Sequence, residues 1–324
     1  MNRKSAAFLI LFSFSLISTW AKIPGANENS REKNRKEIDW VQTNFSPTQE
    51  LIIWRNSYPD VKFDLSWDSE VADWKLTVTN YNKQQSYYWC EGKYLPYEEL
   101  ANKDKYWRVM TFYDREVLDP KDFTPEDVEK LRNWSNNRKN GKVSSKFIFT
   151  AIYDDSTRLT TEQHIKKVSF LGKTTNIHEY LKPMLQRIEK RITELSNSDP
   201  EVKKFLTDLY SAEAYNWREI RDVNTRSFHS YGIAIDILPK MWGKKIVYWG
   251  FEKNNGNKDW MLIPLEKRWM PPKAVIDIFF EEGFIWGGTW AVWDNMHFEY
   301  HPELTVVSKI YAQQELPSER ALKK

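Results

Sequence analysis

The stretch SFHSYGIAIDI, residues 227–237, predicts a strand with one apolar face and one chemically active face. From Gly232 onward the residues alternate, so that the three isoleucines face one side and Asp236 faces the other with the small Ala234. These small neighbours leave room for an approach to the backbone. A buried carboxylate is costly unless it is paired, hydrogen-bonded or bound to a cation. His229 precedes the glycine, where a turn can bring its imidazole over the strand. The pair therefore indicates either a metal site or a hydrogen bond that only orients a loop.

A second strand of the same kind is predicted within FIWGGTWAVWDNMHFEY, residues 284–300. Near its end, apolar residues alternate with His297 and a following glutamate. Two histidines and one carboxylate delivered from strand edges match a catalytic zinc site whose fourth position is open for water. The candidate ligands are therefore His229, Asp236 and His297. Asp294, three residues before His297, is placed to accept a proton from that water.

Other polar residues flank these ligands. Arg218 and Arg221 precede the first strand, and a guanidinium near the metal can stabilise an oxyanion or hold a peptide carboxylate, although either arginine alone is more often a surface charge. Ser227 is expected to donate to or accept from a group near His229. Glu299 is expected either to orient a ligand histidine or to be solvated.

The remaining histidines are not expected to bind the metal. His301 follows His297 by four residues, about 13 Å along an extended strand, and Pro302 opposes the helical alternative. His164 and His178 have no acidic or histidine neighbour at a ligand spacing. Surface or core roles are expected for all three.

The two motifs resemble those of the VanY-like D-alanyl-D-alanine carboxypeptidases and the phage endolysin L-alanyl-D-glutamate peptidases. The matching patterns are S-x-H-x-x-G-x-A-x-D at 227–236, and W-G-G-x-W followed by D-x-x-H-F-E at 286–299. This family of zinc metallopeptidases shares a fold with lysostaphin-type enzymes and the hedgehog signalling domain. The resemblance covers roughly residues 160–305 and implies an α+β fold with a central antiparallel sheet and flanking helices.

The resemblance also implies roles for individual residues. His229, Asp236 and His297 would bind Zn²⁺, Asp294 would be the general base, and Arg218 would contact the substrate or the transition state. The implied reaction is hydrolysis of peptide bonds in peptidoglycan stem peptides, as a D-Ala-D-Ala carboxypeptidase or an L-Ala-D-Glu endopeptidase. Aspartate rather than glutamate at position 294 is more similar to the endolysin-type branch.

The N-terminus has the features of a secretory signal peptide, residues 1–21. Basic Arg3 and Lys4 precede an uncharged apolar run at 6–18, and Ala21 provides a small residue for cleavage. The run is too short for a permanent membrane span, and no second candidate follows. A secreted chain in the periplasm or outside the cell is expected. Loss of two basic residues from a formal net charge of +3 leaves a nearly neutral chain, which implies no nucleic acid partner.

Composition divides the rest of the chain into four segments. They are a flexible polar leader at 22–38, an aromatic-rich α+β accessory region at 39–155, a zinc peptidase domain at 156–312 and a C-terminal tail at 313–324. The only cysteine, Cys90, excludes an internal disulfide and is expected to be a small buried hydrophobe. The tryptophans of the accessory region can fill a core or form a platform for sugar rings, so glycan contact is an open alternative.

Local patterns predict several elements outside the two motifs. In the accessory region, residues 74–89 favour a β-hairpin with a polar turn at 80–86, 147–153 favours a strand, and Thr124-Pro125 favours a helix start. Apolar residues at helical spacing predict a helix over 177–192 that Pro183 interrupts or restarts. Asp199-Pro200 predicts the start of a shorter helix that ends near Leu209.

Two other functions compete with the hydrolase. A catalytically inactive wall-binding or signalling module would keep the fold, but it would be free to lose Asp294, which is present. A non-haem iron oxygenase also uses two histidines and one carboxylate. Secretion argues against it, because iron(II) and its organic cosubstrate are found in the cytosol.

Overall fold

The computed structural model describes residues 43–220, 223 and 225–321. The predicted signal peptide, the leader and Arg221 lie outside the described residues, as do the side chains from 313 onward. In the described part of the chain, no helix has the length and apolar character needed to cross a membrane.

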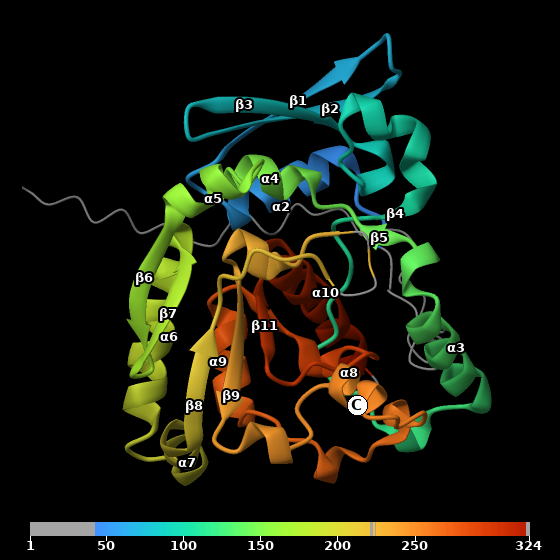
Figure 1. Cartoon of the computed structure of the whole chain (residues 1–324). Coiled ribbons are helices and arrows are strands. Elements are labelled where there is room, and N and C mark those ends of the chain that lie inside the picture. The colour runs from blue at the N-terminus through green and yellow to red at the C-terminus, as the bar shows by residue number, and fades with distance from the viewer. Residues whose placement is uncertain (1–42, 221–222, 224, 322–324) are drawn as a thin grey trace, which may run out of the picture.

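The N-terminal half contains a three-stranded antiparallel sheet covered by helices (Figure 1). The sheet has the order β1-β2-β3, with α2 and α4 packed against it. The short strands β4 and β5 pair in parallel nearby. The elements are α2 (Pro47–Ser57), β1 (Lys62–Asp68), β2 (Asp73–Asn80), β3 (Lys83–Tyr88), β4 (Tyr106–Trp107), α3 (Pro125–Asn136), β5 (Val143–Ser144), α4 (Phe147–Tyr153) and α5 (Arg158–His164).

Two of the three predictions for this half are confirmed. The hairpin forms between β2 and β3, although its turn lies at Tyr81 and Asn82, so that most of the polar segment belongs to the second strand. Thr124 caps α3, because its hydroxyl accepts from the Asp127 amide and the Asp127 carboxylate accepts from the Thr124 amide.

The predicted strand at 147–153 is wrong, because these residues form the helix α4. A short continuous apolar run fits a buried helix as well as a buried strand. Here the buried face carries Ile148, Phe149, Ile152 and Tyr153, and the partly exposed side carries the apolar Phe147 with Thr150, so the sequence shows no polar stripe at the helical period.

The C-terminal half contains a four-stranded antiparallel sheet with the order β10-β11-β9-β8. The helix α9 packs against β10, and the hairpin β6-β7 lies beside β8 (Figure 1). The elements are β6 (Ile165–Phe170), β7 (Lys173–His178), α6 (Lys182–Leu195), α7 (Pro200–Asp208), β8 (Leu209–Glu213), β9 (Ala234–Pro239), α8 (Trp249–Asn254), α9 (Lys273–Glu281), β10 (Phe284–Trp286), β11 (His297–Tyr300) and α10 (Pro302–Ala321). The α+β class is confirmed, whereas the hedgehog-like topology stays a prediction.

Of the two helices predicted for this half, one starts later in the sequence than expected and the other starts where expected. The first begins at Lys182 rather than at Ile177, which lies within the strand β7 instead. Pro183 lies in the first turn, where the missing amide hydrogen costs nothing, so it marks a start and not an interruption. The second helix, α7, begins as predicted because the Asp199 carboxylate accepts from two free amides.

One hydrophobic core joins the two halves. Phe149 of α4 makes ring contacts with Trp54 of α2 and with Phe228 beside the C-terminal sheet. Cys90 is buried and unpaired. Among the described tryptophans of the accessory region, Trp54 is buried and Trp74 and Trp89 are partly buried, whereas Trp67, Trp107 and Trp134 are exposed. Glycan contact and the division into separate domains stay predictions.

Candidate metal centre

Two adjacent strands place an acid and a histidine side by side. In the antiparallel pair β9-β11, Asp236 lies directly opposite His297, so their side chains project from the same face. The apolar alternation that predicted these strands is confirmed, since Ile235 and Phe298 are fully buried on the other side.

His229 reaches this face from the short 3-10 helix η7 (Phe228–Tyr231). Ser227 caps η7, because its hydroxyl accepts from the His229 amide and not from the imidazole. Gly232 ends the turn with a φ of +70°, which favours glycine. The space beside Gly232 is filled, since a Cβ there would lie 2.7 Å from the His178 amide nitrogen. The expected room for an approach to the backbone is therefore occupied by β7.

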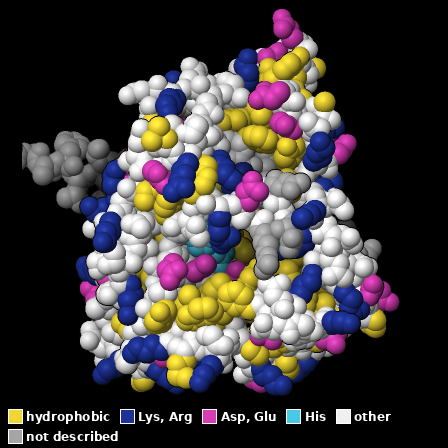
Figure 2. All heavy atoms as spheres, in the orientation of Figure 1, with side chains coloured by type: hydrophobic (Ala, Val, Ile, Leu, Met, Phe, Trp, Pro, Cys, Tyr) yellow, Lys and Arg dark blue, Asp and Glu magenta, His cyan; other side chains and the backbone are white. Residues whose placement is uncertain are grey.

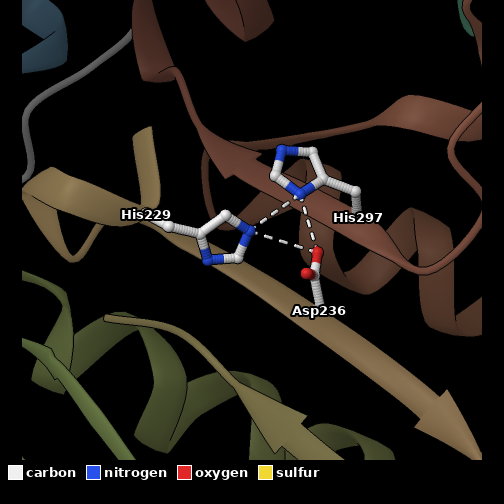
Figure 3. Close-up of side chains that lie close together, drawn as sticks. All are labelled: His229, Asp236 and His297. Carbon is white, nitrogen blue, oxygen red and sulfur yellow. Dashed lines mark hydrogen bonds and ion pairs between the residues drawn. The ribbon is translucent and has the colours of Figure 1, made fainter. Parts of the chain in front are cut away.

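The three candidate ligands converge on one point (Figure 3). His297 Nδ1 lies 2.8 Å from Asp236 Oδ1 and 3.2 Å from His229 Nε2, and His229 Nε2 lies 3.3 Å from Asp236 Oδ1. Among the described residues, these three form the one group of histidines, cysteines and acids arranged to hold a metal ion. Figure 2 shows histidine atoms at the surface near the centre of this face, beside acidic and hydrophobic side chains.

The outer nitrogen of each imidazole is held by an acceptor. His229 Nδ1 donates to the carbonyl oxygen of Ala214, and His297 Nε2 lies 2.9 Å from Glu299 Oε1. In the neutral rings these contacts fix the tautomers, so both inner nitrogens direct lone pairs toward the Asp236 carboxylate. Three electron-rich atoms in contact require a proton or a cation between them. The donor set therefore fits a divalent metal.

The pKa shifts of His297 and Asp236 also indicate that this group favours a positive charge. Burial disfavours the charged ring of His297, but hydrogen bonds to Asp236 and Glu299 outweigh it and raise its pKa well above the usual value. Burial likewise disfavours ionised Asp236, but the charge of His229 and the hydrogen bonds from both histidines lower its pKa.

Asp294 lies beside this group with one oxygen free. Its Oδ1 is buried and has no hydrogen-bond partner. Burial raises the pKa of Asp294 to about 8; the charge of His297 opposes this shift, as does that of Arg218. A cation held by the neighbouring ligands would favour the ionised carboxylate.

The two glycines of the W-G-G motif pack closely against Asp294 and Trp286. A Cβ at Gly287 would lie 2.7 Å from the Asp294 carbonyl oxygen, and one at Gly288 would lie 2.1 Å from the Trp286 ring. The Asp294 amide donates to the Gly287 carbonyl at 2.9 Å. Only residues without a side chain allow this close packing.

Arg218 is exposed, and its backbone is tied to η7. The Ser230 hydroxyl accepts from the Arg218 amide at 2.9 Å and donates to the Arg218 carbonyl at 2.7 Å. Burial raises the pKa of Asp294, and the charge of the Arg218 guanidinium lies near enough to oppose this shift.

The other histidines lie outside the group, as expected. His301 is buried between Glu299 and Glu303. His164 contacts Glu179, and His178 is fully buried against backbone groups.

Three participants were missed by sequence reasoning. The Ala214 carbonyl is a backbone group and carries no sequence signal. Ser230 lies within the first motif, but only the structure shows that it bonds Arg218. Lys146 is buried and donates to the Arg226 carbonyl; burial lowers its pKa to about 8, and the charge of Glu299 opposes this shift.

Comparison with protein families identifies the segment that carries this centre. Residues 221–300 match a family model described as D-alanyl-D-alanine carboxypeptidase. This segment is a domain of that peptidase family. The peptidase match includes the three candidate ligands and Asp294 but not Arg218. Residues 50–111 match a family described as a domain of unknown function. Comparison with curated proteins and with solved structures gives no match.

Proposed function

We propose that this chain is a zinc-dependent peptidase that hydrolyses peptide bonds in the stem peptides of bacterial peptidoglycan. The bond is either D-Ala-D-Ala, in a carboxypeptidase reaction, or L-Ala-D-Glu, in an endopeptidase reaction. The observation that carries the proposal is the convergence of His229, Asp236 and His297 beside the unpartnered carboxylate oxygen of Asp294. The peptidase family match supports it.

Zinc is the metal we propose for this centre. Two imidazole nitrogens and one carboxylate oxygen, each histidine held by a second hydrogen bond, are a donor set that catalytic zinc sites use. When bound, zinc supplies Lewis-acid activation of water and of a carbonyl group. His229, Asp236 and His297 would hold it.

Asp294 and Arg218 have separate roles in this proposal. Asp294 Oδ1 accepts the proton that the attacking water loses, and its burial keeps the proton transfer away from bulk solvent. Arg218, exposed at the rim, holds the carboxylate of the substrate or the negative charge that develops on the carbonyl oxygen.

The proposed location agrees with the substrate. The predicted signal peptide at 1–21 would send the chain to the periplasm or outside the cell, where peptidoglycan is found. Both the location and the peptidoglycan substrate are parts of the proposal.

Product masses test the proposal directly. Zinc-loaded protein would be incubated with muropeptides that carry pentapeptide stems. Loss of one alanine would identify a carboxypeptidase, and separation of the stem after L-alanine would identify an endopeptidase. Unchanged masses with zinc bound would reject both and favour an inactive wall-binding module.

A further inference from the structure

A buried hydrogen-bond network extends from the outer nitrogen of His297, on the side of the ring opposite to Asp236. Glu299 contacts His297 through Oε1 and lies 3.3 Å from His301 Nε2 through Oε2. The other nitrogen of His301 lies 2.7 Å from Glu303 Oε1, in the first turn of α10. One imidazole therefore links two carboxylates.

This hydrogen-bond network ends in the accessory region. The Tyr58 hydroxyl, at the C-terminal end of α2, donates to Glu303 Oε2 at 2.9 Å across a sequence separation of 245 residues. Tyr153 in turn donates to the Tyr58 hydroxyl at 3.3 Å. Tyr58 and Glu303 are both completely buried.

Burial gives this arrangement a specific consequence. A buried carboxylate or imidazole that loses its partner pays a large desolvation cost, so each group holds the next in one orientation. His301 is also confined by ring contacts with Phe149 and Phe228. The orientation of the Glu299 carboxylate, and with it the His297 ring, therefore depends on contacts that begin at Tyr58.

We propose that Tyr58 is a positioning residue of the metal centre, which acts through Glu303, His301 and Glu299 to hold the His297 imidazole in its metal-binding orientation. Residues 43–155 then complete the peptidase centre and are not a separable wall-binding module. This inference rests on the proposed zinc site. It assigns a role to the accessory region, part of which matches only a family of unknown function.

The test compares two tyrosines that lose the same kind of contact. Tyr58→Phe removes the hydroxyl on Glu303, and Tyr94→Phe removes a hydroxyl that donates to the buried Glu50 at 2.6 Å, away from the metal centre. The zinc dissociation constant of the full chain would be measured by competition with a chelator, below the unfolding temperature of each variant. Groups that bond a ligand directly change metal affinity about 10- to 100-fold. Because Tyr58 lies further away, we expect about 3- to 10-fold weaker binding for Tyr58→Phe and no change for Tyr94→Phe.

A second variant tests whether Tyr58 affects zinc binding through the hydrogen-bond network. Glu303→Gln alone should also weaken zinc binding, and the double variant with Tyr58→Phe should weaken it by less than the product of the two single effects. Equal zinc affinity in Tyr58→Phe and the wild type would overturn the inference, as would equal losses in Tyr58→Phe and Tyr94→Phe. Absence of zinc binding by the wild type would overturn the proposed function as well.

Discussion

The imidazole of His297 lies between two carboxylates, with Nδ1 2.8 Å from Asp236 Oδ1 and Nε2 2.9 Å from Glu299 Oε1. Asp236 comes from the neighbouring strand and Glu299 from the same strand, two residues later on the same face. The first carboxylate shares the proposed metal, and the second fixes the ring. A ligand histidine that donates its outer hydrogen to a carboxylate is also a more basic ligand.

Replacement of Glu299 by glutamine is expected to weaken zinc binding about 10-fold. The amide oxygen can still accept from His297 Nε2, but it lacks the charge that strengthens the contact. Chelator competition would measure the change. Glu201→Gln, at an exposed position in the first turn of α7, is the control and should bind zinc as the wild type does. Unchanged affinity in Glu299→Gln would show that the carboxylate does not support the ligand.

The ligand and base assignments predict different losses. His229→Ala should lose both zinc and turnover, because it removes one of three donor atoms. Asp294→Ala should retain zinc and lose turnover by roughly 10²- to 10⁴-fold, the usual contribution of a general base. Metal analysis and product masses would measure the two quantities on the same samples. Full activity in Asp294→Ala would show that the base is another group.

The parts of the centre that follow a local pattern were predictable from the sequence. Alternation around Asp236 and His297 identified both strands and the faces of their side chains, and their antiparallel pairing brings the two residues together. The prediction failed at 147–153, because an almost continuous apolar run shows neither the period of a strand nor that of a helix, and its partly exposed side carries only one polar residue, Thr150.

Contacts that depend on tertiary packing could not be predicted in this way. The acceptor for His229 Nδ1 is the Ala214 carbonyl, which any residue type would provide. The contact between Tyr58 and Glu303 joins residues 245 positions apart. No spacing rule relates them, since their approach depends on how α2 packs against α10.

Gly288→Ala is expected to destabilise the protein by about 1–3 kcal/mol. The added methyl group would lie 2.1 Å from the Trp286 ring, which is fully buried and donates through Nε1 to the Asn295 carbonyl at 2.9 Å. The rigid ring cannot move without loss of that contact. Urea unfolding would measure the change. Gly243→Ala is the matched control, because a Cβ there meets no atom within 4 Å. Equal stabilities of the two variants would contradict the prediction.

We expect the protein to lose stability in mild acid because of the buried, neutral His178. Its Nε2 donates to the Tyr153 carbonyl at 3.0 Å, and its Nδ1 accepts from the Tyr180 amide at 3.2 Å, so the buried ring is neutral. Burial lowers the pKa of His178 from 6.5 to about 4; the contact with the Tyr153 carbonyl opposes this shift. Below pH 6.5 the unfolded chain therefore binds a proton that the folded chain does not.

The contribution of His178 to the free energy of unfolding is thus complete above pH 6.5 and lost progressively as the pH falls to about 4, by roughly 3 kcal/mol. In His178→Gln this position does not titrate, so the free energy of unfolding should fall less steeply over the same interval. Urea unfolding at a series of pH values would compare the two slopes. The slopes decide the question and not the absolute stabilities, because glutamine also alters the packing and lowers stability at every pH. Equal slopes would show that His178 is charged in the folded protein or accessible to protons without unfolding.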